Sequence, residues 1–138
     1  MYEDAMTLEL YPEAGKIQAK RPRIAIKARG RILFIDPLEI MAVEAQGNYI
    51  LMRRLGESDL LRESMTAVAE KLGPYGFVRI HRSVIVNASF VEEIVTLGTG
   101  DCMVRMQGGM EFGVSRTFKK NLRSITPLWI GTNGFRGK

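Results

Sequence analysis

The fold of this chain is decided by residues 77–87, which read FVRIHRSVIVN. Two apolar runs, 77–80 and 84–86, lie on either side of the polar triplet His81-Arg82-Ser83. Short runs rich in β-branched residues are typical of strands, and a three-residue polar spacer leaves room only for a tight connection between them. The segment therefore predicts two neighbouring strands, with Arg82 on a turn that fixes the direction of its side chain.

Similar short apolar runs continue in both directions from this segment. The Gly47-Asn48 pair between two of the runs tolerates positive φ, as a hairpin loop requires. Residues 56–59 are expected to form the next turn. The expected strands lie within residues 24–29, 32–35, 40–45, 49–55, 77–80, 84–86, 91–95, 102–106 and 111–114.

Two segments have helical character instead. In residues 64–72 the apolar side chains of Met65, Val68 and Leu72 recur at i, i+3 and i+7, and Gly73-Pro74 then ends the pattern. A second helix is expected to begin at Ser115, a favourable N-cap, and to end near residue 125, before Thr126-Pro127. The sequence therefore predicts a mainly β fold with two short helices.

Length and composition restrict the class of protein. The 138 residues are 46% hydrophobic and 25% charged, which is ordinary for one globular domain. The single cysteine, Cys102, excludes an intramolecular disulfide, and with His81 as the only histidine the chain cannot assemble a usual Cys/His zinc site. No apolar run approaches the ~20 residues that span a bilayer, and the first residues are acidic, unlike a signal peptide. We expect a cytoplasmic protein with no metal, no cofactor and no membrane insertion.

The distribution of charge points to a polyanionic partner. The formal net charge is +5. Acidic and basic residues balance over residues 1–76, so the whole surplus lies in residues 77–138. Beyond Glu111 the chain has no acid, yet it contains a basic segment around the expected second helix. A positive surface of this kind favours association with nucleic acid.

The sequence contains weaker signals for three other functional classes. Nucleophilic catalysis by Cys102 would need His81 as its base, and the two lie on different expected strands; no catalytic residue is expected. An RNA-recognition motif is an alternative, because Tyr75-Gly76-Phe77-Val78 matches the centre of its ribonucleoprotein octamer. Against it, Ile80 stands where that octamer ends in an aromatic residue. A protein-interaction domain that regulates another factor is the third class.

Three separated blocks, taken together, resemble a known family. They are VEAQGNYI at residues 43–50, FVRIHRSVIVN at 77–87 and VSRTFKKNL at 114–122. In this order and spacing they resemble the LytTR family of bacterial DNA-binding domains, over residues 24–125. The resemblance implies an elongated arrangement of small, mostly antiparallel sheets with two short helices. It also implies a transcription regulator whose edge loops enter successive major grooves of duplex DNA at a direct-repeat site.

The resemblance also implies the contacts. When the family's base-reading positions are matched to this sequence one by one, they correspond to Asn48, Arg82 and Arg116. Their chemistry suits the role, because Asn pairs bidentately with adenine and Arg with guanine O6 and N7, although Asn48 alone is also a common turn residue. His81 and Asn87 are interpreted as architecture that holds Arg82 in place. The expected phosphate contacts are Ser83, Ser115, Lys119 and Lys120.

The expected organisation is one domain with two tails. Residues 1–22 are interpreted as an N-terminal tail or linker, 23–126 as the LytTR-like domain and 127–138 as a C-terminal tail. Members of the family usually carry a sensor or receiver domain ahead of this one. The chain is therefore either a stand-alone regulator controlled by a partner protein or an excised domain. Self-association is expected between copies bound to tandem DNA sites.

Overall fold

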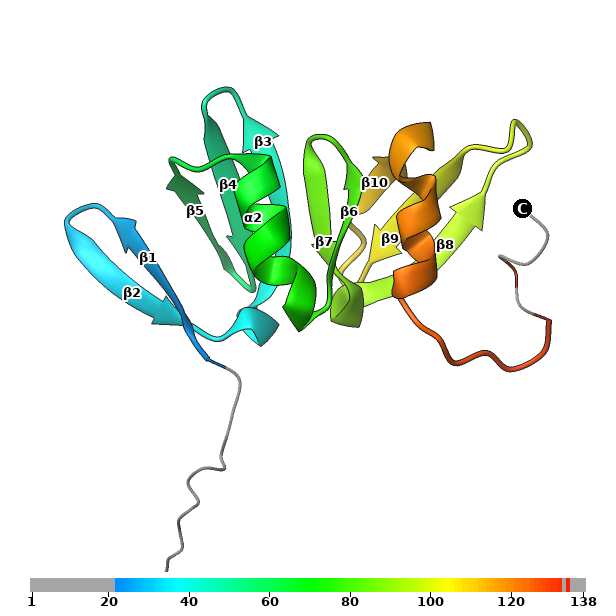
Figure 1. Ribbon diagram of the computed structural model, residues 1–138, viewed down its shortest axis with the longest axis horizontal. Helices are drawn as coiled ribbons and strands as arrows, with labels where there is room; N and C mark the ends of the chain where they lie inside the picture. Colours follow the sequence, from blue (N-terminus) through cyan, green and yellow to red (C-terminus); the bar gives the residue numbers. More distant parts are fainter. Residues whose placement is uncertain (1–21, 133, 135–138) are drawn as a thin grey trace, which may run out of the picture. The chain divides into compact units, whose positions relative to one another are not determined.

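The computed structural model describes residues 22–132 and 134, which divide after Pro37 into two compact units. The first unit contains a two-stranded antiparallel hairpin formed by β1 (Ile24–Ala28) and β2 (Arg31–Ile35) (Figure 1). Its turn residues Arg29 and Gly30 have φ values of 54° and 75°, as a two-residue type I′ turn requires. The expected tail at residues 1–22 lies, apart from Pro22, outside the described residues.

The second unit is built on a five-stranded antiparallel sheet with strand order β5-β4-β3-β7-β6. A two-residue turn joins β3 to β4, where Gly47 has a φ of 60°, and Gln46 pairs with Tyr49 across it. The strands are β3 (Ile40–Gln46), β4 (Tyr49–Arg54), β5 (Glu57–Leu61), β6 (Phe77–His81) and β7 (Val84–Asn87).

Strand β5 replaces the turn that was expected at residues 56–59. The turn is Leu55-Gly56, with Gly56 at a φ of 79°, and Arg54 pairs with Glu57 in the ladder. The guanidinium of Arg54 also binds Asp59 at 2.7 Å. Polar residues dominate this edge strand, so its sequence lacks the apolar alternation by which strands are recognised.

Helix α2 (Met65–Leu72) covers one face of this sheet (Figure 1). Ser64 caps it by accepting a 3.0 Å hydrogen bond from the Ala67 backbone N–H. Met65, Val68 and Leu72 are buried, as their spacing predicts. A 3-10 turn, Gly73–Tyr75, then leads to Gly76 at a φ of 90° and into β6.

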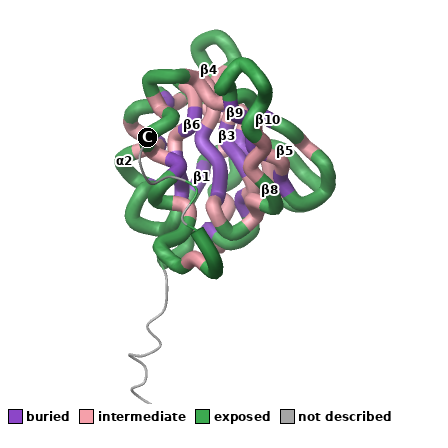
Figure 2. The backbone as a smooth tube through the Cα atoms, turned by 90° about the vertical axis from the view of Figure 1, so that its right-hand side faces the viewer, coloured by how far each residue is buried: buried purple, intermediate pink, exposed green. Residues whose placement is uncertain are grey.

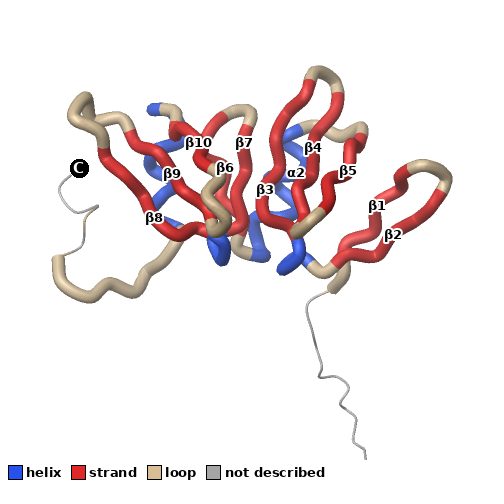
Figure 3. Tube along the Cα trace, turned by 180° about the vertical axis from the view of Figure 1, so that it is seen from behind, coloured by secondary structure: helices blue, strands red, loops and turns tan. Residues whose placement is uncertain are grey.

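A three-stranded antiparallel sheet with order β10-β9-β8 lies beside the β6 and β7 side of the five-stranded sheet (Figure 3), and buried side chains of the two sheets share one cluster. Two short 3-10 segments, Pro37–Glu39 and Ala88–Phe90, precede β3 and β8, and a longer 3-10 helix, Arg116–Ser124, follows β10. The strands are β8 (Val91–Thr96), β9 (Cys102–Met106) and β10 (Glu111–Val114).

A shared hydrophobic core joins the two sheets to the 3-10 helix. It combines side chains of β3, β6 and β7 with those of β9 and β10 and with Leu122 of the helix, and Figure 2 shows the buried segments in purple. The core residues are Ala42, Val78, Ile80, Val86, Cys102, Val104, Met106, Phe112 and Leu122.

The structure confirms the predicted fold class, mainly β with antiparallel sheets and two short helices. The second helix differs in detail, because it is a 3-10 helix that Ser115 precedes without making a side-chain capping bond. The Ser115 hydroxyl oxygen is buried and has no hydrogen-bond partner among the residues that the structure describes. After Ser124 the described residues form no further strand or helix.

Candidate nucleic-acid interface

Three loops of the second unit lie at the same edge of the structure (Figures 1 and 3). They are the β3–β4 turn, the β6–β7 turn and the junction between β10 and the 3-10 helix. We call them together the edge-loop surface, residues 46–49, 81–84 and 114–117. Each loop carries one of the three residues expected to read bases, and all three of these residues are exposed.

Backbone hydrogen bonds tie these loops to one another. The Ala45 N–H at the end of β3 donates to the Ser83 carbonyl at 2.9 Å. A bulge in β6 leaves Ile80 without a partner in β7, since Arg79 pairs with Ile85 and His81 with Val84. The Ile80 carbonyl instead accepts a 2.9 Å hydrogen bond from the Ser115 N–H. Bulges commonly redirect a strand beside a functional site, and this one joins the second loop to the third.

Asn48 occupies the second central position of the β3–β4 turn, after Gly47. Beside it, Tyr49 is 40% exposed, and the Arg62 guanidinium lies over its ring at 5.2 Å. These residues line an open hollow of about 500 Å³ that extends to Ser64 at the start of α2. Asn48 therefore lines a concave surface that also carries one base, Arg62, and one acid, Glu63.

Arg82 is the first residue of the two-residue β6–β7 turn. The Ser83 backbone N–H donates to His81 Nδ1 at 3.0 Å, a bond that requires this ring nitrogen to be unprotonated. Arg79 donates from Nη2 to the Arg82 carbonyl at 2.6 Å and from Nε to the His81 carbonyl at 3.4 Å. The Arg82 carbonyl is thus bound by the Arg79 guanidinium, while the Arg82 side chain is exposed.

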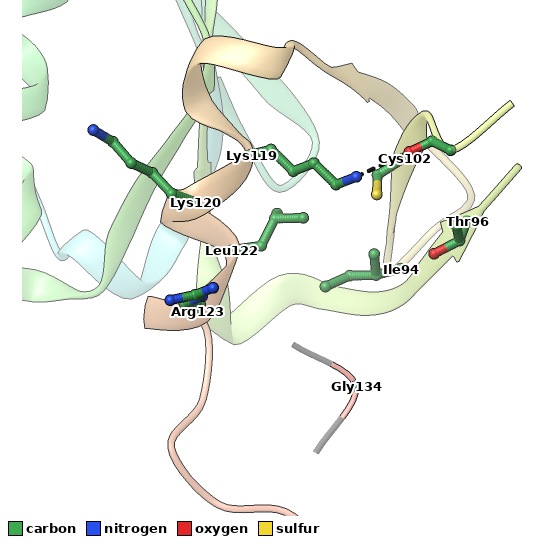
Figure 4. A pocket seen from close by; sticks show the side chains of 9 residues that line it. Ile94, Thr96, Cys102, Lys119, Lys120, Leu122, Arg123 and Gly134 are labelled. Carbon is green, nitrogen blue, oxygen red and sulfur yellow. Dashed lines mark hydrogen bonds between the residues drawn. The ribbon is translucent and has the colours of Figure 1, made fainter. Parts of the chain in front are cut away.

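Arg116 begins the 3-10 helix, and the following basic side chains diverge. Lys119 Nζ donates to the Gly100 carbonyl at 3.0 Å, toward the β8–β9 loop, whereas Lys120 points to the other side of the helix (Figure 4). A hollow of about 490 Å³ lies between the 3-10 helix and strands β8 and β9, and Leu122 and Ile94 form part of its wall. The helix therefore presents positive charge in two directions.

His81 and Asn87 were interpreted as architecture that holds Arg82 in place, and this stays a prediction. His81 accepts the Ser83 amide hydrogen bond described above. Asn87 is 1% exposed, and it donates from Nδ2 to the Ile40 carbonyl at 2.9 Å and accepts from the Ser89 N–H at 2.9 Å. Sequence reasoning missed two further residues, Arg79 and Asn121, whose Nδ2 donates to the Arg79 carbonyl at 2.9 Å. No local pattern marks either, because both act across elements that are distant in the chain.

The structure gives no support to the alternative of an RNA-recognition motif. Phe77, which would have to stack on a base, is only 6% exposed and lies in the core. Within residues 22–132 and 134, no cluster of three His, Cys, Asp or Glu side chains could hold a metal ion. None of the helices in that part of the chain has the length and hydropathy needed to cross a membrane.

The scaffold is mainly β, and exposed Asn and Arg side chains lie on loops at one of its edges. The LytTr DNA-binding domain family matches residues 30–126, and the chain belongs to this family. The family predicted from the three sequence blocks is therefore confirmed, together with its class, a DNA-binding domain.

Known proteins agree with this assignment. The sensory transduction protein LytT of Bacillus subtilis (strain 168) is 23% identical over 107 residues, which cover 78% of this chain and 44% of LytT. LytT of Bacillus anthracis is 23% identical over 113 residues, 82% of this chain and 46% of that protein. The chain thus spans less than half the length of these relatives. A solved LytTr DNA-binding domain from Bacillus cereus shares the fold, with a TM-score of 0.66 and 19% identity over 77% of this chain and 97% of that one.

Proposed function

We propose that the edge-loop surface reads a specific duplex DNA sequence, with its loops in successive major grooves. The observation that carries the proposal is that Asn48, Arg82 and Arg116, far apart in sequence, are exposed on loops at one edge. Backbone hydrogen bonds of neighbouring residues, Ala45 to Ser83 and Ser115 to Ile80, connect the segments that carry these loops. Rigid loops present base-reading groups with little loss of conformational entropy on binding.

Each assigned reader has the chemistry of a base contact. Arg82 and Arg116 carry planar guanidinium groups that match guanine O6 and N7, and the Asn48 amide matches adenine N6 and N7. Arg116 also begins a helix, where a cation opposes the helix dipole. A DNA acceptor that meets both the guanidinium and the helix N-terminus offsets that cost.

Phosphate contacts are assigned to Ser83, Ser115, Lys119 and Lys120. The two lysines are exposed and lie on the acid-free helix. Ser115 contributes only if its hydroxyl, whose oxygen is buried, rotates outward. A lysine bound to a phosphate releases condensed counterions, so these contacts set the salt dependence of affinity and not its sequence preference.

The remaining assignments concern the whole protein. We assign it to bacterial transcription regulation in the cytoplasm, with two copies side by side on a direct-repeat site. Residues 23–126 are the segment assigned to DNA binding. A regulatory protein partner would provide the input signal.

Selection of bound molecules from randomised duplex DNA, followed by sequencing, tests the proposal. Arg82→Ala and Arg116→Ala are each expected to cost ~1–3 kcal/mol on the selected site and to relax preference at one base position, a different one for each variant. Lys71→Ala is the control, because it removes one positive charge from the last turn of α2, away from the edge-loop surface. Equal weakening of binding to the selected and the random duplexes would show that both arginines contact phosphates and do not read bases. Enrichment of single-stranded RNA in a parallel selection would contradict the proposal.

A further inference from the structure

The two hairpin turns of the edge-loop surface are stabilised differently. Two-residue hairpin turns favour positive φ at the first central residue, because that conformation follows the twist of the strands. The β3–β4 turn meets this preference through Gly47, at a φ of 60°. In the β6–β7 turn neither Arg82 nor Ser83 has positive φ, and β6 carries a bulge immediately before it. The conformation that orients Arg82 therefore depends on contacts from outside the turn.

Arg79 makes two of those contacts, beside the Ala45 N–H bond to the Ser83 carbonyl. One guanidinium group donates to two successive carbonyls of the turn, to Arg82 at 2.6 Å and to His81 at 3.4 Å. The same group lies 5.1 Å from the centre of the Phe118 ring and reaches Thr66 Oγ1 at 3.5 Å. Because a guanidinium is planar and carries five N–H donors, it can stack on the ring and hold both carbonyls at once.

The backbone of Arg79 provides a second connection to the 3-10 helix. Its carbonyl accepts the 2.9 Å hydrogen bond from Asn121, so side chain and main chain are both attached to the helix that begins at Arg116. Among the described residues, Arg79 forms no ion pair with a carboxylate. Its charge is balanced by carbonyl oxygens and the face of a ring, in contrast to Arg53 and Arg54, which pair with acids.

We propose that Arg79 is a positioning residue that fixes the Arg82 turn relative to Arg116 and so determines the base preference at the position that Arg82 reads. This inference rests on the proposed function. Arg79 acts through Arg82 and not by touching DNA, since its guanidinium is already engaged with the turn and with Phe118. Lysine cannot replace it, because one ammonium group lacks the planar fork.

The test compares Arg79→Lys and Arg79→Gln with wild type on the selected duplex, on random duplex and on duplexes altered at the Arg82 base. Both variants are expected to lose about 5- to 150-fold of the preference at that base, the range of one bidentate contact, while Arg79→Lys binds random duplex within twofold of wild type. When Arg82 has already been replaced by alanine, Arg79→Gln should cause no further loss of preference at the base assigned to Arg82. Arg105→Gln, on β9, is the control for loss of an arginine from a strand. Wild-type preference in Arg79→Lys, or equal loss at every base position, would overturn the inference.

A second measurement needs no DNA and separates the two proposals. The Ser83 amide hydrogen, bonded to His81 Nδ1, reports on the turn by hydrogen exchange. In Arg79→Gln its exchange should accelerate about tenfold or more, the effect of losing one hydrogen bond to a charged group, while the backbone amides of β9 keep their wild-type rates. Unchanged Ser83 exchange would overturn the positioning role. If Arg82→Ala keeps full base preference, the proposed reading by Arg82 fails, and the exchange rate alone still decides whether Arg79 orders the turn.

Discussion

Replacing Asn87 by alanine is expected to destabilise the domain without changing what it recognises. Among the described residues, Asn87 is the only polar residue that is fully buried, at 1% exposure. Its amide holds the Ile40 carbonyl at the start of β3 and the Ser89 N–H at the start of the 3-10 segment Ala88–Phe90. Alanine can make neither hydrogen bond, so both backbone groups lose a partner.

The magnitude follows from where these groups lie. Ile40 is fully buried, so its carbonyl cannot turn to water, and a buried unpaired acceptor costs about 1–3 kcal/mol. Ser89 is exposed, so water can replace the lost partner of its N–H, and the loss there is that of a helix cap, about 1 kcal/mol. The free energy of unfolding should therefore fall by about 2–4 kcal/mol.

Urea unfolding monitored by circular dichroism measures this change. Ser89→Ala, which alters an exposed side chain in the same turn, should remain within about 0.5 kcal/mol of wild type. Asn87→Asp keeps an acceptor for Ser89 but at neutral pH faces the Ile40 carbonyl with a second acceptor, so it should be at least as unstable as the alanine variant. A loss below about 1 kcal/mol for Asn87→Ala, with an unchanged dependence on urea concentration, would refute the reasoning.

Three further outcomes are expected. Leu122→Ala empties a core position that is 1% exposed and should cost about 2–5 kcal/mol in urea unfolding; a loss under 1 kcal/mol would remove this helix from the core. Lys120→Ala should weaken binding to all duplexes similarly and reduce the slope of log affinity against log salt by about 1; an unchanged slope excludes a phosphate contact. The hydrogen bond from Lys71, with that from the Ser64 amide, holds the pKa of Glu63 below its ordinary value of 4.5. The stability lost in Glu63→Gln should thus be seen above pH 4.5 and disappear as the pH falls through the lowered pKa, whereas an equal loss at pH 2 and pH 7 in thermal melts would contradict the pair.

Much of the fold could be predicted because its signals are local. Gly47-Asn48 has the composition of a hairpin turn, and the spacing of Met65, Val68 and Leu72 is that of a helix packed on one face. Strand β5 was missed because it is a polar edge strand that Arg54 holds through ion pairs. The sequence also did not distinguish the 3-10 character of the second helix, in which backbone hydrogen bonds join residues i and i+3, such as the bond from the Phe118 N–H to the Ser115 carbonyl.

The candidate site could be predicted in part. Asn48, Arg82 and Arg116 were assigned from motif resemblance, and the structure brings their loops to one edge, although contact with DNA itself stays a prediction. Arg79 could not be recognised, because in sequence it is one more basic residue on a strand. Its proposed role depends on a β-bulge and on the ring of Phe118, 39 positions further along the chain. Contacts of this kind between distant parts of the chain cannot be predicted from the spacing of residues in the sequence.

Guanine-N7 methylation interference on the selected duplex tests the central claim most directly. Methyl groups at N7 lie in the major groove, where arginine reads guanine. We expect interference to fall into clusters in successive major grooves on one face of the duplex, with Arg82→Ala abolishing one cluster and Arg116→Ala another. Interference from minor-groove adenine methylation in place of these clusters, or clusters that persist unchanged in both variants, would contradict reading by the edge-loop surface.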